Sequence, residues 1–150
     1  MTAPEHITQE PPPGNRRVQF SGDVVLFHLS LRPPQPGKAY VRTNIGHAHT
    51  MRREVVRKVE CNEPRLERDW FDVPMHQTDS GAFEIRLGLY EVGHFEAKCH
   101  FIPEGEEEPI WPSGPNTVFN DQPADTCCSN ILYNAFVRQF GPAKAASEQP

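Results

Sequence analysis

The 150-residue sequence contains no long hydrophobic run. No window approaches the roughly 18 consecutive apolar residues that a membrane-spanning helix requires. The beginning of the chain, MTAPEHITQEPPPG, also lacks the apolar stretch of a secretory signal peptide. We therefore expect a cytoplasmic protein that does not cross a membrane.

The sequence is also poor in positive charge and in cysteine. Fifteen basic residues stand against twenty acidic ones, and the net charge is −5. Nucleic acids and anionic membranes bind basic surfaces, so we expect neither as a partner. The four cysteines do not form the framework of a disulfide-stabilised secreted domain. The adjacent Cys127 and Cys128 lack the C-x-x-C spacing of a redox pair, and idle thiols are the simpler interpretation.

The fingerprints of common enzyme classes are missing. The sequence has no G-x-S-x-G, no P-loop and no dinucleotide-binding glycine motif. Glu106–Glu108 is a row of carboxylates in a loop rich in proline and glycine. Such groups are solvated and alike, whereas acid–base catalysis needs two carboxyl groups with different pKa values. We therefore expect no catalytic residue and no cofactor.

Histidine is the one metal-ligating residue type that the sequence offers in a suggestive pattern. His47 and His49 would lie on one face of an extended segment, and with His94 or His100 they could supply three nitrogen ligands to zinc. No cysteine or carboxylate accompanies them at a fixed metal spacing. The sequence therefore predicts no metal site.

What the sequence does contain is a clear period of two between Gly81 and Phe101. Apolar residues alternate with polar ones in two runs, which indicates two strands with one buried face each. The buried set is predicted to be Phe83, Ile85, Leu87, Leu89, Phe95, Ala97, Cys99 and Phe101. The short segment Tyr90–Gly93 between the runs predicts an antiparallel hairpin. In that hairpin the exposed Glu84 and Arg86 would face Glu96 and Lys98.

Further strands are predicted on both sides of this segment. Val24–Leu31 is followed by Pro33–Gly37 and by a partner strand at Ala39–Thr43. Asp69–Met75 is predicted to be an edge strand because it contains Pro74, and its Trp70 is interpreted as a core residue. Thr117–Asn120 is a last short strand.

Two segments have a different pattern. Arg52–Val59 fits neither the strand period nor the helix period, so a basic helical turn and an outer strand remain open alternatives. In Ser129–Phe140 the apolar residues Leu132, Phe136 and Phe140 are four apart, which predicts a helix that ends at Gly141-Pro142.

Sixteen prolines and ten glycines suit short strands and many turns. We therefore predict a mostly β protein, an immunoglobulin-like antiparallel β-sandwich with one C-terminal α-helix. Residues 1–22 are expected to be a disordered or loosely attached lead-in. Residues 23–142 would form the sandwich with its connector helix, and residues 143–150 a frayed tail.

Several of these stretches together resemble one family. In chain order they are Gly37-Lys38-Ala39, Val41, Thr43-Asn44, Trp70, Pro74-Met75, Gly81-Ala82-Phe83, Gly93–Lys98, Asn116–Asp125 and Phe140-Gly141-Pro142. They are similar to the β-sandwich that precedes the catalytic barrel of glycogen debranching enzymes, and to the connector into that barrel. The resemblance covers about residues 24–142.

The resemblance implies a role in α-glucan metabolism, with one departure. The catalytic carboxylates of such amylase-type glycoside hydrolases lie in the barrel, whereas this sequence passes from the connector into AKAASEQP. No catalytic residue of the family can therefore be assigned here. The sequence is expected to be a fragment of a larger enzyme or a free-standing relative of its accessory module.

Two function hypotheses follow. In the first, the module binds or positions glycogen or a maltooligosaccharide without catalysis. Trp111 would then stack on a glucose ring, and Asn116, Lys98 and His100 would hydrogen-bond to hydroxyl groups. The alternative for Trp111 is that it folds back to cap one end of the sandwich. In the second hypothesis the module has no sugar affinity and docks on a catalytic barrel domain or on a second copy as a homodimer.

Overall fold

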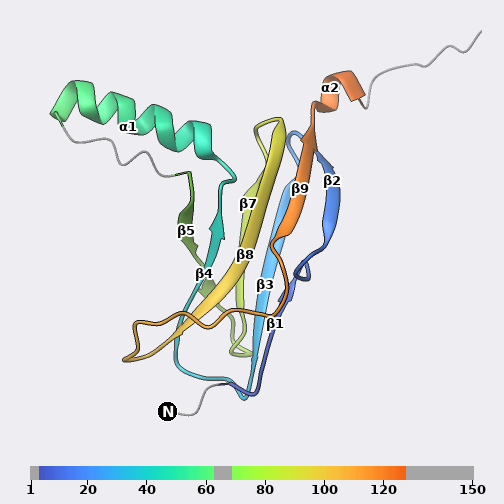
Figure 1. The fold of residues 1–150 in the computed structure, drawn as a ribbon, viewed down its shortest axis with the longest axis vertical. Helices are drawn as coiled ribbons and strands as arrows, with labels where there is room; N and C mark the ends of the chain where they lie inside the picture. Colours follow the sequence, from blue (N-terminus) through green and yellow to red (C-terminus); the bar gives the residue numbers. More distant parts are fainter. Residues whose placement is uncertain (1–3, 63–68, 128–150) are drawn as a thin grey trace, which may run out of the picture.

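The computed structural model describes residues 4–62 and 69–127. Figure 1 shows two layers of long strands, with a helix that projects from one end. In chain order the elements are β1 (His6–Glu10), β2 (Arg16–Phe20), β3 (Val24–Arg32), β4 (Gly37–Thr43), α1 (His47–Cys61), β5 (Phe71–Pro74), β6 (His76–Gln77), β7 (Phe83–Gly88), β8 (Gly93–Pro103), β9 (Thr117–Gln122) and α2 (Ala124–Cys127).

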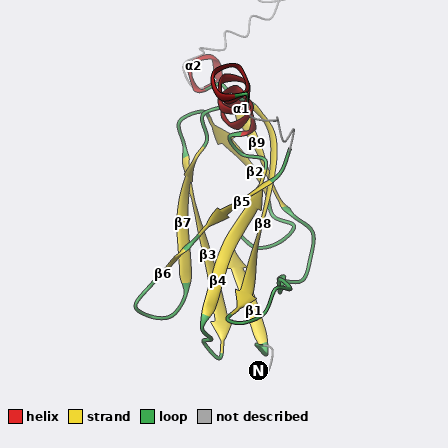
Figure 2. Cartoon of the chain, turned by 90° about the vertical axis from the view of Figure 1, so that its left-hand side faces the viewer, coloured by secondary structure: helices red, strands yellow, loops and turns green. Residues whose placement is uncertain are grey.

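The strands form two sheets. One has the order β1-β3-β7-β6 and the other the order β2-β9-β8-β4-β5. Figure 2 shows the two sheets edge-on, with β7 and β3 in one layer and β4, β8 and β9 in the other. Every pairing is antiparallel except that of β2 with β9, which is parallel. The prediction of a mostly β sandwich is confirmed, and the purely antiparallel arrangement is wrong at this one edge.

The hydrophobic core lies between the sheets. Phe27 from β3 meets Phe119 from β9 edge to face, with ring centroids 5.8 Å apart. Phe83 from β7 meets Phe101 from β8 at 5.7 Å. Each pair joins one sheet to the other, and aromatic contacts of this geometry add to the stabilisation from burial alone. The alternation that the sequence shows along each strand therefore exists to fill this interlayer space.

The predicted hairpin is wrong, although six of its eight predicted core residues are buried and the other two, Ile85 and Leu87, are partly buried. β7 pairs with β3 and β6, and β8 pairs with β4 and β9, so the two strands belong to different sheets. The connection between them passes from one sheet to the other at one end of the sandwich (Figure 1). Its Leu89 is 1% exposed, donates its backbone N–H to Asp23 and accepts the N–H of Gly22. A period of two reveals which face is buried, and it does not reveal which sheet a strand joins.

This crossing separates the charges that the hairpin would have paired. Glu84 binds His28 of β3 in its own sheet, at 2.9 Å. Glu96 instead accepts a hydrogen bond from Asn116, at 3.1 Å. Lys98 donates to the carbonyl of Gly114.

Residues 6–20 are not part of a loose lead-in, because β1 and β2 are strands of the two sheets. The sequence hides β1, since its inward residues are Ile7 and the polar Gln9. The Gln9 amide is buried and fully used: it donates to Pro11 O at 2.8 Å and to Thr117 Oγ1 at 3.2 Å, and accepts from Cys99 N at 2.9 Å. A glutamine thus takes an interior position, where its hydrogen bonds join β1 to the opposite sheet.

Two further assignments differ from expectation. β4 is not the partner of β3: it lies in the other sheet, between β5 and β8. Trp70 is 37% exposed just before β5, so it is not a core residue. The prediction that the Pro74 strand is an edge strand is confirmed, since β5 is the last strand of its sheet.

Arg52–Val59, for which the sequence left a helical turn and an outer strand open, lies within the helix α1. Gly46 precedes the helix and Asn62 follows it, both in the left-handed conformation, and Asn62 N–H donates to Lys58 O. The predicted C-terminal helix at Ser129–Phe140 and the tail at 143–150 lie outside the described residues. Among the described residues, no helix has the length and apolar character needed to cross a membrane.

Candidate functional site

The outer face of the five-stranded sheet carries a cluster of aromatic and ionic side chains. The strand register brings these side chains together. On one side of β4, Tyr40 lies opposite His100 of β8, and on the other side Arg42 lies opposite Asp72 of β5. Side chains two residues apart share one face of a strand, so Tyr40 and Arg42 both point outward. The outer-face cluster consists of Tyr40, Arg42, Asp72, His100 and Trp111.

Trp111 reaches the cluster from the loop that follows β8. Ile110 donates its backbone N–H to the carbonyl of Phe101 at 2.7 Å, and its own carbonyl accepts the N–H of Phe101 at 3.0 Å. This bridge fixes the returning chain along β8, and Lys98 holds the next part of the loop at Gly114. The indole is thereby placed over the sheet and not at an end of the sandwich.

Three rings pack in a row across the cluster. Tyr40 stacks on His100 with centroids 5.4 Å apart and planes at 20°. The Trp111 ring contacts His100 at 4.5 Å and 36°. His100 is covered on both sides and is 1% exposed, while Tyr40 and Trp111 remain half-buried. The two outer rings are therefore held rigidly and keep part of their surface in solvent.

The ionic half of the cluster borders Trp111. Arg42 donates from Nε and Nη2 to the two carboxylate oxygens of Asp72, both at 2.8 Å, and its guanidinium carbon lies 5.2 Å from the centre of the Trp111 ring. A bidentate pair fixes the guanidinium plane, which favours contact with an aromatic face. The hydrogen bonds from Arg42 hold the pKa of Asp72 below its usual range.

His100 is the buried titratable group of this face. Its Nε2 lies 3.9 Å from Asp72 Oδ2, and its Nδ1 has no hydrogen-bond partner within residues 4–62 and 69–127. Burial lowers the pKa of His100, and the nearby Asp72 charge only partly opposes this. His100 is therefore a neutral ring at pH 7 that supports Trp111 and Tyr40.

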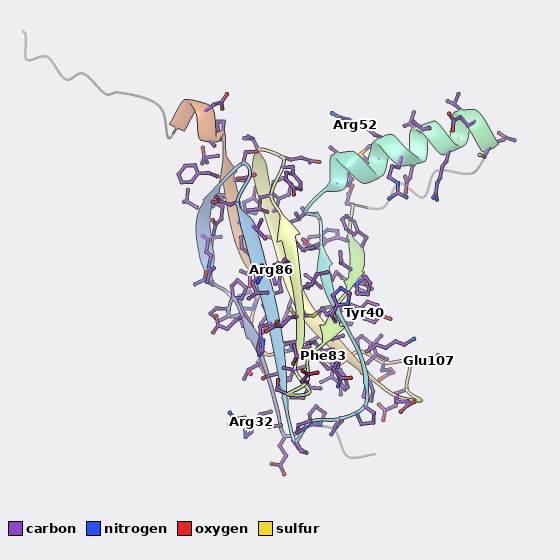
Figure 3. All side chains as sticks on the ribbon, turned by 180° about the vertical axis from the view of Figure 1, so that it is seen from behind. Arg32, Tyr40, Arg52, Phe83, Arg86 and Glu107 are labelled. Carbon is purple, nitrogen blue, oxygen red and sulfur yellow. The ribbon has the colours of Figure 1, made fainter. Side chains whose placement is uncertain are left out.

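A groove adjoins the cluster and shares Tyr40 with it. Its volume is about 720 Å³. Figure 3 shows Tyr40 and Glu107 on the same side of the molecule. The groove is lined by Pro36, Gly37, Lys38, Tyr40, Gln77, Ile102, Pro103, Glu104, Gly105, Glu106 and Glu107. Its walls thus combine an aromatic ring with an ammonium, an amide and carboxylates, a mixture that can both donate and accept hydrogen bonds.

The structure brings only part of the predicted sugar-binding set together. Trp111 and His100 touch, but His100 is buried beneath the indole and has no surface for a ligand. Lys98 donates a hydrogen bond to Gly114 O, and Asn116 donates one to Glu96. They shape the loop and do not face the groove. Trp111 packs on His100 over the sheet, so the alternative that it caps one end of the sandwich is wrong, and its role in sugar binding stays a prediction.

Sequence reasoning missed Tyr40, Arg42, Asp72 and Gln77. The signal for the first two was available, because AYVRT places an aromatic and a basic residue on the polar face of one strand. Asp72 can be assigned to the site only when the pairing of β4 with β5 is known, and Gln77 only when the whole fold is known.

The histidines considered for zinc do not converge. His47 lies in the first turn of α1, with its Nε2 3.5 Å from Asp69 Oδ1. His94 of β8 forms a hydrogen bond with Asn120 of β9, at 2.9 Å. Because His47 and His49 lie in a helix, the extended geometry assumed for the pair is wrong. The described part of the chain holds no group of three or more metal-ligating side chains.

A comparison with protein-family models and with curated proteins finds no match for this chain.

Proposed function

We propose that this chain is a non-catalytic accessory module of α-glucan metabolism in the cytoplasm, which binds a glycogen or maltooligosaccharide chain along the outer-face groove. One observation carries the proposal: a groove of about 720 Å³ that shares Tyr40 with a row of three packed rings, of which Tyr40 and Trp111 stay partly exposed. The likeness of residues 24–142 to the sandwich of glycogen debranching enzymes supports the choice of ligand.

The physical basis is the two-sided chemistry of a sugar ring. One face of a glucose unit presents C–H groups that pack on an aromatic ring, and the hydroxyls around its edge donate and accept hydrogen bonds. Tyr40 supplies a ring whose orientation is fixed by His100, so little conformational entropy is lost on binding. Lys38, Gln77 and Glu104 line the same groove and offer donors and acceptors to the hydroxyls.

Hydrolysis is not part of the proposal. The carboxylates of the groove, Glu104, Glu106 and Glu107, are all exposed on one loop. No difference in environment separates a general acid from a nucleophile or base among them. Binding and positioning are therefore the tasks that this geometry supports.

Affinity electrophoresis in native gels with and without glycogen tests the proposal. We expect glycogen to retard the wild-type protein, and Tyr40→Ala and Trp111→Ala to abolish the retardation. Trp70→Ala is the matched control, because Trp70 is also partly exposed but belongs neither to the groove nor to the outer-face cluster. Purified protein should release no reducing sugar from limit dextrin.

The outcome that contradicts glucan binding is equally clear. Wild-type mobility that is unaffected by glycogen would exclude it. Retention of retardation in a folded Tyr40→Ala variant would exclude this groove. Release of reducing sugar that a point substitution in the chain abolishes would show that the module is an enzyme.

A docking role is a second candidate, favoured by α1. Val55, Val56 and Val59 of this helix are 43%, 50% and 80% exposed. Apolar side chains in a projecting helix are typical of a surface that packs on another protein.

A further inference from the structure

α1 is an arm with an unusual charge for this protein. From Arg52 to Cys61 nearly every side chain is exposed, and Figure 1 shows the helix extending away from the sheets. Its charged residues are Arg52, Arg53, Glu54, Arg57, Lys58 and Glu60. The arm is therefore basic, although the whole chain carries a net charge of −5.

The arm offers a shallow hollow on one side. Arg52, Arg53 and Arg57 line it together with Val56 and Glu60, around a volume of about 490 Å³. A lone helix of this length is marginal in water, and exposed valines lower its propensity further. Packing of this face on a partner would supply the stabilisation that the sandwich does not give it.

An acidic loop lies on the same side of the molecule as α1, at the opposite end of β5 (Figure 1). The loop from Glu104 to Glu108, called the acidic loop here, contains four glutamates that are all exposed. Its shape is fixed by the Phe101–Ile110 bridge and by a turn in which Glu106 N–H donates to Pro103 O at 3.1 Å. Concentrated like charge on a fixed loop is attracted to a complementary basic surface.

The two features flank β5, the edge strand. Figure 1 shows α1 at one end of β5 and the tip of the loop after β8 at the other end, both projecting to the same side. In Figure 3 the labels of Arg52 and Glu107 mark these two ends. A two-fold rotation about an axis through the middle of this edge exchanges the ends, and it brings each basic arm onto the acidic loop of the other copy.

We propose that the partner of α1 is a second copy of this chain, in a symmetric dimer in which each arm lies on the other copy's acidic loop. Both contacts in such a dimer are identical, as two-fold symmetry requires. The reverse arrangement, arm beside arm and loop beside loop, places like charges together and is disfavoured. The proposal rests on charge and placement and does not require glucan binding, but Glu104, Glu106 and Glu107 also line the groove, so both proposals involve the same loop.

Charge reversal at each end tests the proposal. We expect sedimentation equilibrium at low salt to show a wild-type dimer, and added salt to weaken it. The arm variant Arg53→Glu/Arg57→Glu and the loop variant Glu106→Lys/Glu107→Lys should each weaken the dimer at least about tenfold. Arg86→Glu is the control, because Arg86 is exposed on the outer face of the other sheet.

The decisive step is a mixture of the two monomeric variants. A pair of one arm variant and one loop variant restores opposite charges at both contacts, so we expect a heterodimer that neither variant forms alone. Circular dichroism of each variant establishes that the sandwich is intact.

Three results would overturn the proposal. The first is a wild-type chain that is monomeric at low salt up to millimolar concentration, the second is a dimer that both variants leave unchanged, and the third is a mixture that stays monomeric. A monomeric wild-type protein whose arm binds poly-glutamate, with loss of binding in Arg53→Glu/Arg57→Glu, would assign the arm to a different acidic partner and not to a second copy.

Discussion

The outer faces of the two sheets are built on opposite plans. On the four-stranded sheet, outward residues of β3 such as Val24 and Leu26 are 59% and 44% exposed. On the five-stranded sheet, the outward His100 of β8 is 1% exposed, because the chain's own loop brings Trp111 over it. One sheet therefore has a single buried face, and the centre of the other is buried on both sides. A covered sheet face with a groove beside it is where a ligand can be held by rigid groups.

The largest effect is expected in the core that both sheets share. Phe101→Ala removes a fully buried ring that packs on Phe83, and should lower the free energy of unfolding by about 3–5 kcal/mol. Leu26→Ala, on the open face, should cost under about 1 kcal/mol because the side chain is already largely in water. Urea denaturation measures both, and equal midpoints would show that the burial of the two faces is assigned wrongly.

An intermediate effect is expected where the loop covers the sheet. Trp111→Ala should lower the free energy of unfolding by about 1–2 kcal/mol, because the indole is half-buried and its contact with His100 is lost. Thermal melts of this variant and of Trp70→Ala, whose indole is 37% exposed, test the difference. A Trp111 variant no less stable than the Trp70 variant would mean that the loop does not hold the covered face.

The covered face should also make stability depend on pH. Burial lowers the pKa of His100, so the unfolded chain takes up its proton at a higher pH than the native protein does. Stability is then fully present above about pH 6.5 and is lost as the pH falls through the lowered native pKa. His100→Gln should flatten this part of the melting profile. The pKa of Asp72 is also lowered, and its contribution disappears only below about pH 3.8.

Asp121 offers the opposite sign. It is 1% exposed at the end of β9, and burial together with the nearby Asp23 raises its pKa. Because the unfolded chain ionises first, the native state loses stability as the pH rises from about 3.8 through the raised pKa. Asp121→Asn should therefore raise the melting temperature at pH 7, and the gain should shrink in acid. A gain that is independent of pH would contradict this assignment.

The smallest effect is expected on the open sheet. His28 and Glu84 form a partly exposed pair at 2.9 Å, and Glu84→Ala should change the free energy of unfolding by under about 1 kcal/mol. A larger loss, measured by urea denaturation, would mean that the open face is as tightly constrained as the covered one.

The sequence predicts which face of a strand is buried better than it predicts which strands pair with each other. The interior sides of β3, β4, β7 and β8 follow from apolar alternation, since burial depends on side chains within one strand. Sheet membership depends on partners remote in sequence, and the Leu89 crossing could not be read from the pattern of β7 and β8. β1 was missed because its interior residue is Gln9, which is buried through specific hydrogen bonds and not through hydrophobicity.

The candidate site shows the same limit. Trp111 was found because an aromatic residue in a proline-rich loop needs an explanation. The ligand role predicted for His100 was wrong because its alternating position says nothing of a loop that later covers it. Tyr40 and Asp72 become part of a site only when β4, β5 and β8 are placed side by side.

The central claim is that glucan binds along the groove beside the covered face. An NMR titration of ¹⁵N-labelled protein with maltoheptaose tests it most directly. The account predicts shifts confined to the indole N–H of Trp111 and to the amides of Lys38, Tyr40, Gln77 and Glu104–Glu107, with none on β3 or β7. A spectrum that does not change at millimolar sugar, or shifts that gather on the four-stranded sheet, would contradict it.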